Sequence, residues 1–179
     1  GAECSRFKDH AVGSISFLGS GAMPMTAVML AKMYPDVPIV CVDYDEEACK
    51  LSRQLCEKLG LQDRVTILHM KALDYTPADK ELVFCAALLD GKKDVYAHLD
   101  KYNSALIVRD AEGPYQYVYK AAELPKAHFQ QVAKTEIDTR RINTSRFYIH
   151  KPELHHDRPH HEPSPQRNKK SGPALCPCN

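Results

Sequence analysis

The stretch Ile15–Pro24, which reads ISFLGSGAMP, decides the fold of the chain. Its short, mostly apolar first part predicts a buried strand over 15–18, which Gly19 ends. A helical pattern runs from about Pro24 to Met33, with proline in the first turn, where its missing N–H leaves no hydrogen bond unmade. A strand, a tight glycine turn and a helix in this order predict a βα unit.

The alternation continues along the chain. Further strands are expected over 37–42, 65–68, 82–86 and 105–108, helices over 45–59, 94–101 and 115–124, and an antiparallel pair over 129–137 and 143–149. Nearly continuous apolar strands between helices are typical of a parallel sheet covered on both faces. The predicted fold class is α/β and Rossmann-like, with a mostly parallel sheet, helices on both faces and a terminal antiparallel strand pair.

Composition and charge limit the class of protein. The 179 residues are 44% hydrophobic and 26% charged, which is typical of one soluble globular domain. The 24 basic and 23 acidic side chains give no basic excess, so nucleic acid is not an expected partner. No apolar run is long enough to span a membrane, and the first residues lack the order of a signal peptide. We therefore expect a cytoplasmic protein, in which the seven cysteines are reduced and mostly fill the core.

Two regions are expected: a domain over residues 1–150 and a flexible tail over 151–179. The tail holds six of the twelve prolines and four of the nine histidines, and it contains no aromatic residue. So few apolar side chains cannot offset the entropy of ordering the segment. Its histidine pairs are a weak alternative metal site, and no metal ligand is assigned.

Ligands of parallel sheets bind beyond the carboxyl ends of the strands, so the residues that follow each strand are the candidate site. Gly19, Ser20 and Gly21 follow the first strand and allow the backbone to approach a ligand closely. Pro24 stands where a dinucleotide motif has its third glycine, which counts against NAD and FAD and favours S-adenosylmethionine (SAM). The alternative is a plain turn between strand and helix.

The second and third strands are followed by candidates for the nucleoside. Asp43 ends the second strand and is expected to accept hydrogen bonds from both ribose hydroxyls, whereas Asp45 is expected to cap the next helix. Tyr44 lies along the adenine or is simply a half-exposed aromatic. Ala72 occupies the position where an acid often binds the adenine amino group, so a backbone group or Asp74 would serve instead.

Small and charged residues follow the last two parallel strands. Ala87 and Leu88 leave room for a ligand or form a packing site. Arg109 is placed to bind a carboxylate with both arms of its guanidinium. Glu112 or Asp110 is placed to accept a proton from an attacking amine. The alternative is a salt-bridged loop over solvent.

Residues 17–26, FLGSGAMPMT, resemble the G-x-G-x-x-P-[LM]-[TS] segment of the nicotianamine synthases. Further stretches agree in order and spacing, and together they cover about residues 12–150: 42–45, 86–88, Arg109 with Gly113 and Tyr119, and 143–145. The family includes plant and archaeal enzymes and bacterial synthases of opine-type metallophores such as staphylopine.

The resemblance implies a class I methyltransferase-like fold that transfers the 3-amino-3-carboxypropyl group of SAM to an amine and releases methylthioadenosine. Plant members join three such units, and bacterial members add one unit to histidine. The acceptor is then an amino acid such as histidine or glutamate, or a second SAM. The catalytic candidates are Arg109, Glu112 and Tyr119.

Two features depart from the family. Family members carry a helical domain before the glycine motif, whereas about 18 residues precede Gly19 here, so a missing amino-terminal domain and a possible homodimer are expected. The tail has no counterpart. The alternatives are an ordinary SAM methyltransferase, a SAM-binding fragment without turnover, and a protein that handles metal through its tail.

Overall fold

The computed structural model describes residues 12–111, 124, 128–134 and 143–150. Over these residues, strands and helices alternate as the sequence predicts. The strands are β1 (Ile15–Leu18), β2 (Ile39–Asp43), β3 (Val65–His69), β4 (Leu82–Cys85), β5 (Ala105–Ala111), β6 (Phe129–Lys134) and β7 (Asn143–His150). The helices are α2 (Met25–Met33), α3 (Glu46–Lys58) and α4 (Lys92–Leu99), with a short 3-10 helix over Ala72–Asp74.

The strands form one sheet in the order β3-β2-β1-β4-β5-β7-β6. The first five are parallel to one another, while β7 runs antiparallel to both β5 and β6. The predicted fold class is therefore confirmed, including the terminal antiparallel pair. The chain fills the sheet outward from β1 in one direction and then outward from β4 in the other, so the order reverses between β1 and β4.

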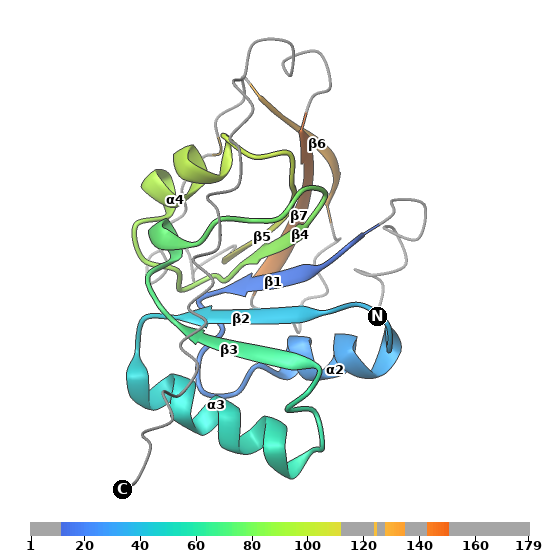
Figure 1. Cartoon of the computed structure of the whole chain (residues 1–179). Coiled ribbons are helices and arrows are strands. Elements are labelled where there is room, and N and C mark those ends of the chain that lie inside the picture. The colour runs from blue at the N-terminus through green and yellow to red at the C-terminus, as the bar shows by residue number, and fades with distance from the viewer. Residues whose placement is uncertain (1–11, 112–123, 125–127, 135–142, 151–179) are drawn as a thin grey trace, which may run out of the picture.

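Helices cover both faces of this sheet, as Figure 1 shows. On one face, α2 and α3 bury apolar side chains against a cluster that includes Phe17, Phe84 and Ile107. On the other face, α4 buries Tyr96 and Leu99 against a second cluster. The near-absence of polar side chains on both faces of the central strands explains why these strands read as continuous apolar runs.

Some boundaries differ from the predicted ones for identifiable reasons. Helix α4 begins at Lys92 rather than Asp94, because Gly91 adopts a left-handed φ of 61° and its carbonyl accepts the N–H of Val95. Strand β5 continues to Ala111 because β7 pairs with it from Leu106 to Ala111. The predicted helix over 115–124 lies outside the described residues except for its last position.

Two local expectations are confirmed. The carboxylate of Asp45 caps α3 by accepting the N–H groups of Glu47 and Ala48 at 2.9 and 3.1 Å. The described cysteines are free and buried, as expected of thiols that fill the core: Cys41, Cys49, Cys56 and Cys85. No helix in the described part of the chain is long and apolar enough to cross a membrane.

Candidate functional site

The carboxyl ends of the parallel strands lie along one edge of the sheet, which we call the carboxyl edge. The strand order places the ends of β1 and β4 next to each other at the point where the order reverses. A crevice opens at such a point because the connections after the two strands leave in opposite directions. The structure thus brings the residues that follow β1, β2, β3 and β4, together with the end of β5, to a common edge.

The glycine turn after β1 has the backbone geometry that the sequence motif requires. Gly19 and Gly21 have φ angles of 74° and 68°, a region that side chains with a Cβ rarely adopt. A Cβ on Gly19 would lie 3.3 Å from the Cβ of Ala86, so the turn packs closely against the end of β4. The N–H groups of Gly19 and Ser20 both donate to the carbonyl of Val42. The turn is therefore anchored between β2 and β4.

Asp43 holds this turn in place with its side chain. Its Oδ2 accepts the N–H of Gly21 at 2.7 Å, and its Oδ1 accepts the N–H of Asp45 at 3.0 Å. This role is not evident from the sequence, whose only signal for it is an acid at the end of the strand next to a glycine turn. A carboxylate has about four acceptor positions, so each oxygen keeps capacity for a ribose hydroxyl.

The residues that follow β2 and β3 are joined by backbone contacts. The N–H of Met70 donates to the carbonyl of Asp43, and Nε2 of His69 lies 2.9 Å from the carbonyl oxygen of Tyr44. Tyr44 is 63% exposed. Ala72 begins the 3-10 helix. Leu73, within the same 3-10 helix, is 42% exposed, so two large side chains are exposed along this part of the edge.

Ala87 and Leu88 lie in the turn that follows β4. Ala87 is half-buried, and Leu88 is 73% exposed. The neighbouring Ala86 donates its N–H to the carbonyl of Leu18, which fixes the start of this turn beside the glycine turn. The eight residues expected to bind the cofactor all lie at or shortly after the carboxyl ends of β1, β2, β3 and β4, and their role in binding stays a prediction.

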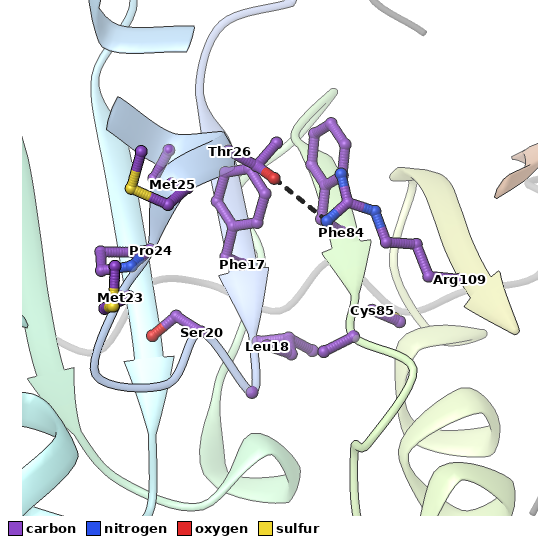
Figure 2. A pocket seen from close by; sticks show the side chains of 13 residues that line it. Phe17, Leu18, Ser20, Met23, Pro24, Met25, Thr26, Phe84, Cys85 and Arg109 are labelled. Atoms are coloured by element: carbon purple, nitrogen blue, oxygen red, sulfur yellow. Dashed lines mark hydrogen bonds between the residues drawn. The ribbon is translucent and has the colours of Figure 1, made fainter. Parts of the chain in front are cut away.

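A pocket of about 130 Å³ opens beside the glycine turn, between the end of β1, the start of α2 and the end of β4. Figure 2 shows Arg109 reaching from β5 across the ring of Phe84 toward Thr26. Its Nη1 donates to the hydroxyl of Thr26 at 3.1 Å, and its guanidinium carbon lies 5.6 Å from the centre of the Phe84 ring. Phe17 stacks on Phe84 with ring centres 4.4 Å apart and completes the apolar wall.

The electrostatics of this pocket favour an anion. Arg109 supplies a permanent positive charge, and no described residue that lines the pocket is acidic. The first turn of α2, from Met25, also faces it and presents the positive end of the helix dipole. A volume of about 130 Å³ is well below the roughly 300–1,000 Å³ of pockets that enclose a whole drug-sized ligand. The pocket therefore suits one carboxylate-bearing end of a larger molecule.

Asp110 follows Arg109 in β5 but lies on the other face of the sheet. Its carboxylate is buried and pairs with Lys92 at 2.8 Å and with Arg146 at 2.9 Å. Both oxygens of this carboxylate are therefore bonded to cations on the face of the sheet opposite the pocket. Asp110 does not line the pocket, and its expected role as proton acceptor stays a prediction.

The cysteine beside the pocket is not a nucleophile in this arrangement. Burial raises the pKa of the Cys85 thiol to about 12, and it does the same to Cys41. A thiol with such a pKa carries almost no thiolate near neutral pH. Among the described residues, no group of His, Cys, Asp and Glu side chains is arranged to hold a metal ion.

Comparison with known proteins decides the family. The family model described as "Nicotianamine synthase protein" matches residues 3–145. The chain belongs to the nicotianamine synthase family. This result confirms the resemblance that the glycine motif and the later stretches indicate.

One relative of this nicotianamine synthase family chain is the L-histidine 2-aminobutanoyltransferase of Yersinia pestis. The two are 36% identical over 104 residues, which cover 55% of this chain and 38% of the relative. The crystal structure of a mutant of MtNAS in complex with S-adenosylmethionine has a TM-score of 0.70 at 22% identity and covers 84% of this chain and 60% of that one. The mitomycin 7-O-methyltransferase MmcR has a TM-score of 0.61 at 16% identity, over 79% and 50% of the two chains.

The structural likenesses show a methyltransferase-like fold, and the chain spans less than two thirds of the length of these relatives. The candidate catalytic residues Glu112 and Tyr119 lie outside the described residues, as does the tail over 151–179. Of the three catalytic candidates, the structure describes Arg109 alone.

Proposed function

We propose that this chain binds SAM and takes part in transferring its 3-amino-3-carboxypropyl group to an amine, with release of methylthioadenosine. The product would be a nicotianamine-like metal chelator, a metallophore. The acceptor would be the amine of an amino acid such as histidine or glutamate, or of a second SAM. The Yersinia pestis relative, which is named for transfer to L-histidine, supports histidine as the first acceptor to test.

The observation that carries the proposal is the position of Arg109 in the small pocket beside the glycine turn. Its guanidinium lies over Phe84 and next to Thr26, where it would bind the carboxylate of the group to be transferred. Charge-assisted bonds from a planar guanidinium to a carboxylate fix orientation as well as position. Such an anchor would determine which carbon next to the sulfonium is presented to the amine.

The other candidates would bind the nucleoside end. Asp43 would accept hydrogen bonds from the ribose hydroxyls with the acceptor positions that Gly21 and Asp45 leave open. Tyr44, Ala72, Ala87 and Leu88 would border the adenine, and Gly19 and Ser20 would run beneath the ligand. The exposure of Tyr44 and Leu88 supports this assignment, because a bound ring would cover apolar surface that is otherwise in water.

Transfer of this group to an amine requires mainly that the reactants be positioned and that a group accept the proton. When bound, SAM supplies a sulfonium, which is a good leaving group. An unprotonated amine forms a bond to Cγ, the Cγ–S electron pair moves to sulfur, and the new ammonium loses a proton. Arg109 would hold the chain of the transferred group in line, Glu112 would accept the proton, and Tyr119 is the third catalytic candidate.

The test is to identify the nucleoside product. The 179-residue chain is incubated with SAM and a panel of amino acids that includes histidine, and the products are separated and weighed by mass spectrometry. Methylthioadenosine is expected. S-adenosylhomocysteine would instead establish methyl transfer, the second candidate, which the methyltransferase-like fold favours. Binding of SAM with no product in any mixture would contradict both.

Location and organisation belong to the same proposal. A cytoplasmic chain with a SAM-binding domain over 1–150 and a separate tail over 151–179 would suit reduced thiols and a soluble substrate. A homodimer is part of the proposal too. Sedimentation of the chain with and without residues 151–179, together with SAM binding by both, would test the division.

A further inference from the structure

Lys92 is a buried cation that the proposed chemistry does not use. It is the first residue of α4, and it is only 5% exposed. Lysine is almost never buried to this degree unless its charge is paired. Here its Nζ donates to Oδ1 of Asp110 at 2.8 Å and to the backbone carbonyl of Arg109 at 3.4 Å. One side chain thus contacts two consecutive residues of β5.

The direction of Arg109 depends on the strand that carries it. Consecutive side chains of a strand point to opposite faces of the sheet, so the face that Asp110 occupies determines the face that Arg109 occupies. Asp110 points toward α4, where Lys92 holds it, and Arg109 points into the pocket on the side of α2. A shift of the end of β5 would move the guanidinium relative to Thr26 and Phe84.

We infer that Lys92 is a positioning residue for Arg109. By bonding the side chain of Asp110 and the backbone carbonyl of Arg109 from the side of α4, it fixes the end of β5 so that the guanidinium points into the small pocket, which is the proposed carboxylate subsite. This inference rests on the proposed function, because it assigns the pocket to the carboxylate of SAM. Lys92 does not touch the pocket itself, so it acts through Arg109.

Lys92 is not the sole cation that neutralises the buried carboxylate of Asp110. Arg146 of β7 donates to Oδ2 of the same carboxylate at 2.9 Å, so Asp110 keeps a cationic partner when Lys92 is replaced. The bond to the carbonyl of Arg109 is a contact that Lys92 makes in addition to the ion pair. Because Lys92 also begins the helix that follows the turn with Ala87 and Leu88, it ties that turn to β5.

The test measures recognition of the carboxylate by binding. Dissociation constants of the 179-residue chain are measured by titration calorimetry for SAM and for decarboxylated SAM, which keeps the sulfonium and the amine but lacks the carboxylate. The ratio of the two constants reports on Arg109 and is insensitive to a general loss of folded protein. The variant is Lys92→Met.

Arg64→Met is the matched control. Arg64 is also a cation that donates to backbone carbonyls, those of Tyr34 and Val37 at 2.9 and 3.4 Å, but it lies at the opposite edge of the sheet. If Lys92→Met does not fold, Lys92→Gln replaces it, because glutamine keeps an N–H donor without the charge.

The chain is expected to bind SAM roughly ten- to a hundredfold more tightly than the decarboxylated compound, as one charge-assisted contact provides. Lys92→Met is expected to lower this ratio by about three- to tenfold, a typical coupling between contacting residues. Arg64→Met should leave the ratio unchanged. In an Arg109→Met background, Lys92→Met should have no further effect on it.

An unchanged ratio in Lys92→Met would overturn the inference, as would an equal fall in Arg64→Met or a further fall in the Arg109→Met background. Equal binding of the two compounds by the unsubstituted chain, or binding of neither, would overturn it as well. The proposed function is judged separately by its nucleoside product. Methyl transfer with an intact Lys92 effect would therefore contradict the reaction and support the inference.

Discussion

Each edge of the parallel sheet holds a buried carboxylate beside the central strands, Glu81 at the amino edge and Asp43 at the carboxyl edge, and the two have different surroundings. At the amino edge, Glu81 accepts hydrogen bonds from the Tyr75 hydroxyl at 2.7 Å, the Ala78 N–H at 2.9 Å and the Ser14 hydroxyl at 3.2 Å. At the carboxyl edge, Asp43 accepts two backbone N–H groups. Glu81 is enclosed by its donors, whereas Asp43 lies beside a turn that borders the crevice.

This difference supports the proposal that Asp43 binds ligand and that Glu81 has a structural role. Burial is similar, at 2% for Glu81 and 9% for Asp43, so burial alone does not distinguish them. The hydrogen-bond partners of the two carboxylates distinguish them. Side-chain hydroxyls and a local N–H satisfy Glu81, while Asp43 orders the backbone of the glycine turn and keeps acceptor capacity toward the ligand side. Function in this fold follows the edge on which the group lies.

The largest expected effect comes from replacing the two carboxylates in parallel. Asp43→Asn is expected to weaken SAM binding roughly a hundredfold, because two hydrogen bonds to a charged group contribute about 1.5 kcal/mol each. Glu81→Gln should leave SAM binding within about twofold and lower the free energy of unfolding by about 1–3 kcal/mol, since it sets an amide N–H₂ against a donor. Calorimetric titration and urea denaturation measure the two quantities.

Two results would contradict this difference between Asp43 and Glu81. If Glu81→Gln weakened SAM binding as much as Asp43→Asn at equal stability, the two edges would not differ in function. A folded Asp43→Asn variant with unchanged affinity for SAM would remove Asp43 from the site.

Two glycines with the same backbone conformation give the next largest effect. Gly19 and Gly60 have φ angles of 74° and 67°, so Gly→Ala at either position should cost about 1–2 kcal/mol of unfolding free energy. A Cβ on Gly19 meets Ala86 at 3.3 Å, whereas one on Gly60 meets no atom within 4 Å. Gly19→Ala should therefore also weaken SAM binding about tenfold, or about 1.4 kcal/mol, and Gly60→Ala should not.

Because the two variants carry the same backbone strain, any difference between their affinities for SAM reports on the position of the glycine rather than on stability. Loss of SAM binding in Gly60→Ala, which lies after α3 at the amino edge, would show that binding responds to stability in general. The distinction between the edges would then lose its support.

The smallest effect concerns Cys85, which lies at the carboxyl edge but is assigned to packing. Burial raises its pKa from 9.0 to about 12, so the folded chain keeps the proton over a pH range in which the unfolded chain releases it. The stabilising contribution is therefore complete below pH 9 and is lost as the pH rises toward 12, by at most about 1.4 kcal/mol per unit. Denaturation at several alkaline pH values should show a shallower decline for Cys85→Ala than for the unsubstituted chain.

The same variant, Cys85→Ala, also tests whether the thiol takes part in the reaction. Cys85→Ala should retain product formation within a few-fold at neutral pH, because a thiol with a raised pKa does no chemistry there. Complete loss in a stably folded variant would assign Cys85 to the reaction.

Much of the fold follows from local sequence. Apolar runs of four to seven residues predict the strands, and the spacing of apolar positions with the Asp45 cap predicts α3. Of the boundaries that were wrong, the start of α4 has a local cause in Gly91, whereas the end of β5 depends on a partner distant in sequence. Strand β5 extends to Ala111 because β7 pairs with it, and no local pattern near residue 108 contains that information.

The candidate site divides in the same way. The motif around Gly19 and the position of Asp43 are visible in the sequence. The opposite faces taken by Arg109 and Asp110 are a local property of any strand, but which face holds the pocket is not. The contact of Lys92 with β5 joins residues 17 and 18 positions apart, and it depends on how α4 packs.

The most direct test of the central claim follows the atoms of SAM into the product. The chain is incubated with histidine and with SAM labelled isotopically either in its carboxyl carbon or in its methyl carbon, and the histidine derivative is weighed by mass spectrometry. For transfer of the aminocarboxypropyl group, we expect the carboxyl label in the histidine derivative and the methyl label in methylthioadenosine. A derivative that carries the methyl label, beside S-adenosylhomocysteine, would contradict this expectation.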